Sequence, residues 1–350
     1  MERVYIKDSA QHLDQEITCA GWVHRIRSLG KVTFLLLRDR TGIVQTVWNE
    51  APEVTLESVV SIKGKVNKND KAPGGIELQA DSLEVLAPAA ADLPIAVNQD
   101  TDKLSIDALL DHRMLSLRNP KIRSIFFLQS DILRYFAEYM RSRDFTEIKS
   151  SKLIGSGSEG GTGLFEVEYF DRKVYLAQSP QLYKQAMVAN GMEQVFEIGA
   201  AYRAEKHEIP RHLNEYVSLD IEMAFIESDQ ELMDLEVGIL GYIFDQIKSH
   251  NGEVLDMFGT DLPGAAEMQK TPRISHDEAK KILSGRLGKR GFEPHPERGR
   301  EVWKWALEHN GVEAVFVHSF PRKKRPFYTY PDGRKTMSFD LLFRGLEITS

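Results

Sequence analysis

Five short runs of apolar residues fill the first 85 residues of the chain, and turn-forming residues separate them. Their β-branched and aromatic content and their length are typical of β-strands, and no convincing long helical pattern interrupts them. Five strands in so short a segment favour a small closed barrel, either of the oligonucleotide-binding kind or of a generic kind. The expected strands span residues 17–24, 32–39, 43–48, 59–66 and 76–85.

The strand pattern ends after residue 86. The segment APAAADL, residues 87–93, has small residues and a proline without periodicity, which is typical of a linker. A chain of 350 residues with 42% hydrophobic content can bury two cores. We therefore expect two domains, residues 1–88 and 121–350, joined by a hinge over residues 89–120.

Apolar spacings of three and four predict two long helices in the second domain. The first runs over residues 123–143. The second begins at the capping box formed by Ser228 and Glu231 and continues to Asn251.

The following segment is polar and contains proline and glycine, and we interpret residues 253–312 as an insertion. Weak helical patterns occur near residues 277–283 and 300–310. Strands return from Val315 onward.

Candidate chemistry is densest in residues 178–222. Ser179 can cap a short helix, Pro180 suits its first position, and Gly191 follows its last apolar residue, so that Lys184 lies one turn inside. A lysine in an arbitrary helix is most often a solvated charge.

The strand at the end of this stretch alternates strictly, with Asp220 and Glu222 on the face opposite to its apolar residues. Upstream, Arg203 and Glu205 would project together if their segment is extended. These residues alone allow two interpretations, a solvated strand face with ion pairs or a binding site. Between the strands, residues 206–212 superficially suggest a zinc-binding HExxH motif, but the second histidine is one residue too far and Pro210 forbids the helix.

Basic and aromatic residues are interleaved in the expected barrel, which is the mixture that single-stranded nucleic acid binding uses. Between residues 21 and 40 the basic residues outnumber the single acid, Asp39, and Trp22 and Phe34 lie among them. The alternative is that these aromatic residues belong to the barrel core. The basic residues are Arg25, Arg27, Lys31, Arg38 and Arg40.

Composition narrows the class of protein further. The net charge of −7 disfavours general coating of nucleic acid, so that local patches have to supply such contacts. The single cysteine, Cys19, excludes intrachain disulfides and cysteine metal clusters. No apolar run is long enough for a bilayer span or a signal peptide, and we expect a cytoplasmic protein without a membrane partner.

The order YRAE, a loop, and RHLNEY leading into a strand resembles motif 2 of the class II aminoacyl-tRNA synthetases, and the aspartyl enzymes most closely. The segment GWVHRIRSLGKVTFLLLRDRTGIVQ resembles the anticodon-binding domain of the aspartyl, asparaginyl and lysyl enzymes. This resemblance implies an α+β chain, with an N-terminal five-stranded OB-fold barrel and a catalytic domain built on an antiparallel sheet flanked by helices. Residues 123–153 resemble motif 1, the dimer element, with Ser151 where the family has proline, and imply a homodimer.

The resemblance also implies sites for ATP and magnesium. Arg203 is the catalytic residue that would contact the α-phosphate, and Glu205 would accept a hydrogen bond from the adenine amine. Mg²⁺ would lie between the phosphates and two residues of the last strand, Glu347 and Ser350. The residues implied for ATP are Arg203, Glu205, Arg211, His212 and Glu347.

For L-aspartate, the resemblance implies that Lys184 pairs with the side-chain carboxylate and Asp220 with the α-ammonium. Ser179 and Gln181 would add polar contacts. In the glycine-rich segment GSGSEGGTGLF, Glu159 matches the glutamate of a mobile loop that closes on the bound amino acid.

For tRNA, the resemblance implies that Phe34 stacks on an anticodon base and Gln45 contacts base edges, beside Arg25. Enzymes strictly specific for tRNA(Asp) tend to have Trp and Lys at the positions of His24 and Pro73. The residues present here imply an enzyme that charges tRNA(Asp) and also tRNA(Asn).

Family members continue beyond the last strand with a GGQR segment and motif 3, and neither is within these 350 residues. We therefore expect a catalytic domain that is incomplete at its C-terminus, and a chain that is inactive as given. The favoured function is aspartate–tRNA ligase. The alternatives are an asparagine–tRNA ligase, a noncatalytic tRNA-binding paralogue or fragment, and an amidating enzyme on the same scaffold, which would not need the barrel.

Overall fold

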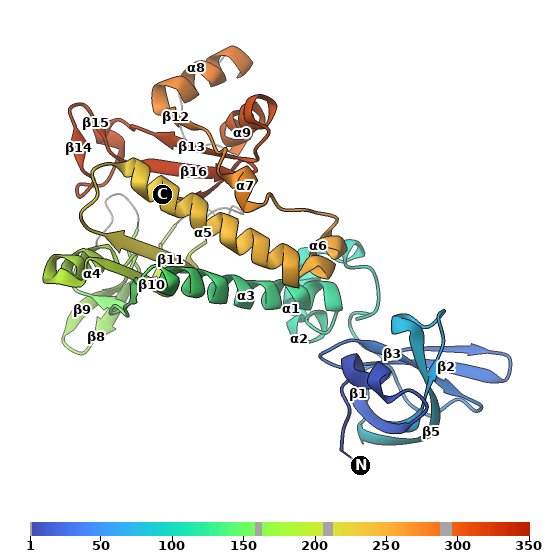
Figure 1. The fold of residues 1–350 in the computed structure, drawn as a ribbon. Coiled ribbons are helices and arrows are strands. Elements are labelled where there is room, and N and C mark those ends of the chain that lie inside the picture. The colour runs from blue at the N-terminus through green and yellow to red at the C-terminus, as the bar shows by residue number, and fades with distance from the viewer. Residues whose placement is uncertain (1, 158–162, 206–212, 288–295) are drawn as a thin grey trace. The chain divides into compact units, whose positions relative to one another are not determined.

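The computed structural model describes residues 2–157, 163–205, 213–287 and 296–350 (Figure 1). The chain divides into two compact units, Met1–Ile125 and Phe126–Ser350. The division falls inside helix α3 (Pro120–Ser142). Among the described residues, no helix is both long and apolar enough to cross a lipid bilayer.

The first unit is built on a closed barrel whose strands follow the order β1-β2-β3-β5-β4. Only β3 and β5 pair in parallel. Alternate residues such as Leu35, Leu37 and Ile62 are fully buried in its interior. The five expected strands and the closed barrel are confirmed. The strands are β1 (Glu16–Leu29), β2 (Val32–Arg38), β3 (Ile43–Trp48), β4 (Val59–Lys68) and β5 (Ile76–Ala87), and the short helices of this unit are η1 (Ile6–His12), η2 (Pro73–Gly75), η3 (Thr101–Lys103), α1 (Ile106–Asp111) and α2 (Arg113–Ser116).

Gly21 allows one of the close backbone approaches in the barrel. β1 pairs with β2 along one part of its length and with β4 along the other, and Gly21 lies where the two pairings meet. A Cβ atom at Gly21 would lie 2.2 Å from the carbonyl oxygen of Arg38. Only glycine allows this contact, because any side chain would push the strands apart.

A buried ion pair joins the barrel to the segment that follows it. Arg38 donates two hydrogen bonds to the Glu57 carboxylate, at 2.9 and 2.7 Å, and both side chains are at most 2% exposed. Arg118 reaches the same carboxylate at 3.2 Å. His24 completes the group, because its Nδ1 accepts from Arg38 at 2.7 Å and its carbonyl accepts from Asn98.

The second unit is organised around two long helices, α3 and α5 (Asp229–His250), whose apolar faces form its main core. Both expected helices are confirmed, and Ser228 and Glu231 form the expected capping box. A three-stranded sheet of order β11-β10-β6 packs on this core through residues such as Phe196, Leu219 and Ile221. The elements of this part are β6 (Thr146–Glu147), β7 (Leu153–Ile154), β8 (Glu166–Tyr169), β9 (Arg172–Leu176), α4 (Gln181–Met187), η4 (Val188–Met192), β10 (Gln194–Tyr202) and β11 (Glu215–Met223).

A second sheet, of order β12-β13-β16-β17, contributes Phe316 and Leu341 to the same core. The opposite face of this sheet packs on α8 and α9 through Val315, Val317 and Leu342. Residues 253–312 therefore supply one strand and two helices to this sheet, and both weak helical patterns are confirmed. The elements are α6 (Gly252–Phe258), α7 (Ala265–Met268), β12 (Arg273–Ser275), α8 (His276–Leu287), α9 (Pro296–Asn310), β13 (Ala314–His318), η5 (Arg322–Lys324), β14 (Pro331–Asp332), β15 (Lys335–Thr336), β16 (Phe339–Phe343) and β17 (Leu346–Thr349).

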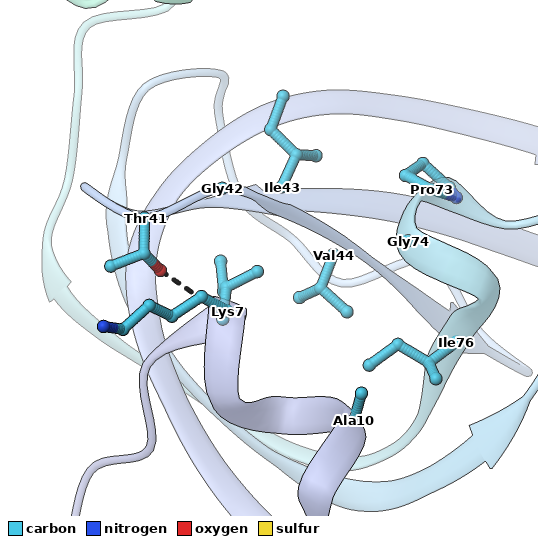
Figure 2. A pocket seen from close by; sticks show the side chains of 10 residues that line it. Lys7, Ala10, Thr41, Gly42, Ile43, Val44, Pro73, Gly74 and Ile76 are labelled. Atoms are coloured by element: carbon cyan, nitrogen blue, oxygen red, sulfur yellow. Dashed lines mark hydrogen bonds between the residues drawn. The ribbon is translucent and has the colours of Figure 1, made fainter. Parts of the chain in front are cut away.

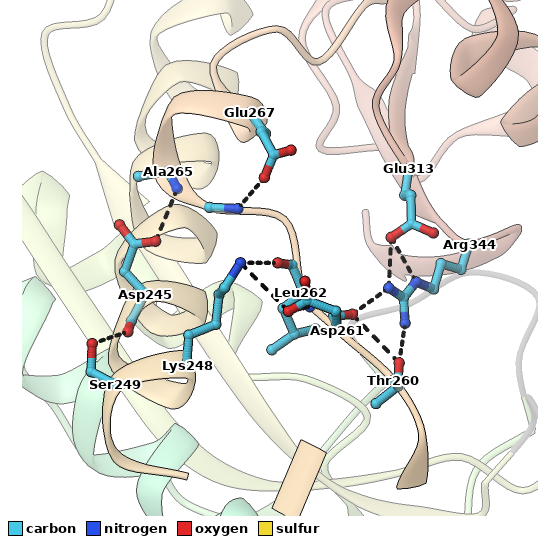
Figure 3. A network of polar contacts seen from close by, with 11 residues as sticks. Asp245, Lys248, Ser249, Thr260, Asp261, Leu262, Ala265, Glu267, Glu313 and Arg344 are labelled. Carbon is cyan, nitrogen blue, oxygen red and sulfur yellow. Dashed lines mark hydrogen bonds and ion pairs between the residues drawn. The ribbon is translucent and has the colours of Figure 1, made fainter. Parts of the chain in front are cut away.

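Polar contacts fix the irregular segment between α6 and α7, as Figure 3 shows. Arg344, at the β16–β17 turn, donates to the Glu313 carboxylate and to Thr260 Oγ1 at 2.9 Å. Lys248 of α5 donates to the carbonyl of Leu262 at 2.8 Å and lies 3.5 Å from Asp261. These bonds join α5 to the second sheet and so hold both strand systems on one core.

Replacing Glu57 with glutamine should destabilise the protein by about 3 kcal/mol, because the buried Arg38 guanidinium would lose its counter-charge. The free energy of unfolding in urea, followed by circular dichroism, measures this loss. Glu53→Gln removes the same charge from an exposed position four residues earlier and should change stability by less than about 0.5 kcal/mol. Equal effects of the two substitutions would contradict the assigned role of Glu57.

Candidate active site and nucleic-acid interface

The polar face of β11 lies opposite the main core. Leu219 and Ile221 pack against that core, so the alternation of the strand directs Asp220 and Glu222 to the other side. In the β10–β11 pairing Asp220 is opposite Glu197. The predicted carboxylate face is confirmed.

Helix α4 brings a lysine onto this face. Lys184 Nζ lies 3.2 Å from Asp220 Oδ1 and 3.7 Å from Glu222 Oε2, and it donates to the carbonyl of Ile221 at 3.1 Å. The side chains of Lys184 and Asp220 are only 11% and 14% exposed. One cation therefore serves two carboxylates in a partly desolvated site, which leaves an excess of negative charge.

The start of α4 explains the position of this lysine. The helix begins at Gln181, one residue later than expected, and Ser179 Oγ accepts a hydrogen bond from the Gln181 amide at 3.3 Å. The Gln181 side chain then donates to Glu222 at 3.4 Å. Burial raises the pKa of Glu222, and the charge of Lys184 opposes this rise. The four residues predicted to bind aspartate on this face thus lie together: Ser179, Gln181, Lys184 and Asp220. Glu222 lies beside them, although it was not predicted as an aspartate-binding residue.

Glu197 is a further member of this face, and it was missed from the sequence. Its side chain is 1% exposed and accepts hydrogen bonds from Lys152 at 2.9 Å and from Ser150 Oγ at 2.7 Å. Burial alone would raise its pKa, but the hydrogen bonds from Lys152 and Ser150 lower it below the usual range. A charged residue within the apolar run VFEIGAA was the available signal.

Arg203 and Glu205 lie just beyond the end of β10. The Arg203 guanidinium is 5.6 Å above the ring centre of Tyr216, and its amide donates to the Asn214 carbonyl. Among the described residues, its buried Nε has no hydrogen-bond partner. A partly buried guanidinium with an unsatisfied donor fits an anionic ligand such as a phosphate. Glu205 follows in a tight turn, with its amide donating to the Arg203 carbonyl at 2.8 Å.

A β-bulge places Glu347 and Ser350 on one side of the second sheet. Leu341 pairs with Thr349, but Leu342 pairs with Glu347, so Ile348 is the extra residue. The extra residue shifts the alternation, and positions 347 and 350, three apart, come to the same face. Both side chains are exposed.

The end of β17 is tied to Arg325. This arginine donates to Asp340 Oδ1 at 2.6 Å and lies 3.5 Å from Ser350 Oγ. Among the described residues, no group of three His, Cys, Asp and Glu side chains is arranged to hold a metal ion. Glu347 and Ser350 supply oxygen ligands of the kind that Mg²⁺ accepts when phosphates complete its coordination.

Glu236 of α5 is a buried carboxyl group near this strand end. Burial raises its pKa to about 7, and the charge of Asp340 adds to the rise. Three other predicted site residues, Glu159, Arg211 and His212, lie outside the residues that the structure describes.

The barrel presents one outer face with two rows of side chains. Strand pairing places Arg25, Leu36 and Gln45 side by side in one row. Arg27, Phe34 and Val47 form the next row. Phe34 is partly exposed, and Gln45 donates to Glu77 at 3.0 Å. Arg25, Phe34 and Gln45 therefore share one surface, where a stacking ring lies beside basic and hydrogen-bonding groups.

His24 and Pro73 differ from this group in position. His24 is 9% exposed beside Arg38, and burial, assisted by the charge of Arg38, lowers its pKa to about 4, so its ring is neutral at pH 7. Pro73 is exposed in the turn before β5, where Gly74 and Gly75 both have φ of +74°. Figure 2 shows Pro73 at a pocket that is also lined by Ile6, Lys7, Ala10, Thr41, Gly42, Ile43, Val44, Gly74 and Ile76.

A five-stranded closed barrel before a helix-backed sheet with a lysine–carboxylate site is the architecture of a class II aminoacyl-tRNA synthetase. The family described as "tRNA synthetases class II (D, K and N)" matches residues 105–350. The "OB-fold nucleic acid binding domain" matches residues 17–86. The chain belongs to the class II tRNA synthetases for Asp, Lys and Asn, and the resemblance and fold inferred from the sequence are confirmed. Aspartyl-tRNA synthetases of this family use ATP and Mg²⁺ and bind tRNA and aspartate.

Several curated relatives carry the name of one activity. The chain is 44% identical to the "Aspartate--tRNA(Asp/Asn) ligase" of Thermus thermophilus, covering 99% of this chain and 82% of that protein. It is 39% identical to the "Aspartate--tRNA(Asp) ligase" of Pyrococcus abyssi, and the match covers 96% of this chain and 80% of that protein. The crystal structure of asparaginyl-tRNA synthetase from Pyrococcus horikoshii with asparaginyl-adenylate matches with a TM-score of 0.89 at 29% identity. The match covers 98% of this chain and 81% of that chain.

Glu236→Gln should change how stability depends on pH. With a pKa of about 7 in the folded state against an ordinary 4.5, Glu236 stabilises the fold when protonated, below pH 4.5, and this contribution is lost as the pH rises through 7. Glutamine cannot ionise, so the variant should gain about 2 to 3 kcal/mol relative to the parent between pH 4.5 and 8. Urea unfolding at pH 5 and pH 8 measures the gain. The exposed Glu253→Gln should show none, and a pH-independent difference for Glu236→Gln would refute the assignment.

Proposed function

We propose that this protein is an aspartate–tRNA ligase, which activates L-aspartate with ATP and transfers it to tRNA. The observation that supports this most directly is the partly buried contact of Lys184 with Asp220 and Glu222. Aspartate has two carboxylates and one ammonium group, and this site offers a cation and two carboxylates within a few ångströms. The names of the relatives point to the same amino acid.

When aspartate binds, the ion pair between Lys184 and Asp220 would be replaced by two ion pairs with the substrate. The substrate side chain would take Lys184, and its α-ammonium would take Asp220. The number of opposite-charge contacts in the desolvated site is then not reduced, which keeps the cost of burying the charges low. Asparagine has no side-chain carboxylate to pair with Lys184, so this lysine favours aspartate over asparagine.

Activation joins two anions, the aspartate carboxylate and the α-phosphate of ATP, and therefore needs cations and positioning more than a general base. We assign Arg203 to the α-phosphate because its guanidinium is partly buried with an unsatisfied donor. Glu205 would accept from the adenine amine, and Glu347 and Ser350 would hold Mg²⁺. The magnesium ion, when bound, would neutralise phosphate charge. Arg211 and His212 keep their assignment to ATP, and Glu159 to the closing loop, from resemblance.

The barrel face would bind the anticodon, with Phe34 stacking on a base and Gln45 and Arg25 supplying hydrogen bonds. We further propose that both tRNA(Asp) and tRNA(Asn) are substrates, because His24 and Pro73 replace the Trp and Lys of strictly specific enzymes. Since His24 is buried, its effect would pass through Arg38 and the shape of the strand rather than through a direct base contact. A homodimer, formed through α3 and the strand after it, completes the proposal.

Lys184→Met should lower kcat/KM for aspartate by at least about a thousandfold, because two carboxylates of the site and one of the substrate would lose their cation. Aspartate-dependent ATP–pyrophosphate exchange by the full-length protein measures this. Lys173→Met, an exposed lysine on β9, is the matched control and should keep normal exchange. An absence of exchange in the parent protein would reject the ligase proposal in favour of a tRNA-binding paralogue, and exchange with asparagine would favour an asparagine–tRNA ligase.

His24→Trp combined with Pro73→Lys should reduce charging of tRNA(Asn) about tenfold or more while charging of tRNA(Asp) changes less than threefold. Aminoacylation of the two tRNAs with radiolabelled aspartate measures both. Because His24 is buried, the thermal unfolding of the variant is compared with that of the parent. Unchanged charging of tRNA(Asn) by a folded variant would contradict dual specificity set by these positions.

A further inference from the structure

The segment between β13 and β16 concentrates positive charge on an otherwise acidic protein. Residues 321–336 contain six basic residues and one acid, Asp332, within a chain of net charge −7. The residues proposed for the active site all lie outside this segment. The basic residues are Arg322, Lys323, Lys324, Arg325, Arg334 and Lys335.

The backbone brings the two ends of this segment together. The Arg322 amide donates to the Arg334 carbonyl at 3.1 Å, and Pro321 forms a β-bridge with Lys335. Residues 322–324 form the short helix η5, and the β14–β15 hairpin that follows lies at one end of the second sheet (Figure 1). Arg322 and Arg334 are therefore neighbours in space although they are twelve residues apart.

The six basic side chains divide into two sets. Arg325 is paired with Asp340 at 2.6 Å, and Lys335 with Asp277 at 2.8 Å, and these two contacts anchor the segment. The side chains of Arg322, Lys323, Lys324 and Arg334 are exposed. Positive charge gathered on one exposed loop attracts a polyanionic partner.

Two aromatic side chains are exposed within the same segment. Phe327 is 79% exposed and Tyr330 is 69% exposed. Leaving large rings in water is costly, whereas a ring beside cations is the combination that binds single-stranded RNA, by base stacking and phosphate contacts. An acidic protein surface would use the cations but not the stacking platforms.

The anchor at Arg325 also places this segment next to the proposed ATP-binding strand. Arg325 contacts both Asp340 of β16 and Ser350 at the end of β17. If the proposed function holds, the 3′ end of tRNA has to reach this strand end to receive the amino acid. We propose that residues 321–336 form a binding surface for the acceptor arm of tRNA, with the exposed cations on its phosphates and Phe327 and Tyr330 against its unpaired 3′ nucleotides.

The test uses the full-length protein and an RNA minihelix that contains only the acceptor stem and its single-stranded 3′ end. The triple variant Arg322→Gln, Lys323→Gln, Lys324→Gln should weaken minihelix binding about tenfold at 0.1 M salt. It should also reduce the slope of log K against log[salt] by two to three units. The variant Lys270→Gln, Lys281→Gln, Lys304→Gln removes the same charge from exposed positions of the same unit and should change binding less than threefold.

The aromatic positions are tested separately. Phe327→Ala with Tyr330→Ala should weaken binding of the minihelix severalfold and have no effect once its single-stranded 3′ end is removed. Equal effects of the two triple variants, or unchanged binding in the loop variant, would overturn the proposal.

Aspartate-dependent exchange distinguishes this inference from the proposed function. Normal exchange with weakened minihelix binding in the loop variant supports the acceptor-arm surface. Loss of exchange in the loop variant alone would overturn it, because the segment would then serve adenylate formation. Absence of exchange in the parent would instead reject the ligase activity.

Discussion

The contact of Lys184 with Asp220 and Glu222 is the interaction on which the rest of the catalytic unit depends. Two carboxylates two residues apart on a partly buried strand face lose hydration, which is the main reason why the pKa of Glu222 is raised, and the charge of Asp220 adds to the rise. A cation from α4 makes the arrangement tolerable. The position of α4 relative to β11 is therefore an electrostatic requirement, and the start of the helix after Pro180 meets it.

The same contact explains why the core has its particular form. For Asp220 and Glu222 to face the site, Leu219 and Ile221 have to face the other way, and α3 and α5 provide the apolar surface that covers them. The second sheet follows the same rule, because Leu341 enters that core while Asp340 lies opposite, beside Arg325. The polar residues proposed for the amino acid and for ATP thus lie on or next to strands whose alternate residues fill one core.

Features that depend on local sequence were predictable. The period of two in β11 gave the carboxylate face, and the capping box gave the start of α5, because both follow from backbone geometry over a few residues. The five barrel strands were predicted, and most of their predicted ends lie within a few residues of the observed ends. The largest error was at β1, which continues to Leu29 as a hairpin arm.

Features that depend on distant residues were not predictable in the same way. Glu197 is held by Ser150 and Lys152, more than forty residues earlier, and only the folded sheet brings them together. His24 follows a strand pattern that is compatible with either face, but the buried pair of Arg38 and Glu57 draws it inward. The family resemblance predicted roles for residues in these regions, but only the structure shows that His24 is buried.

The bulge in β17 explains how Glu347 and Ser350 can share one face of the sheet although their spacing does not fit a regular strand. Residues three apart on a regular strand lie on opposite faces, so Glu347 and Ser350 could not both contribute to one ion. The pairing of Leu342 with Glu347 and of Leu341 with Thr349 leaves Ile348 as an extra residue and restores a common face. Bulges are common beside active sites because they redirect a side chain without breaking the sheet. Arg325, which contacts both Asp340 and Ser350, holds the end of the strand beyond the bulge against β16.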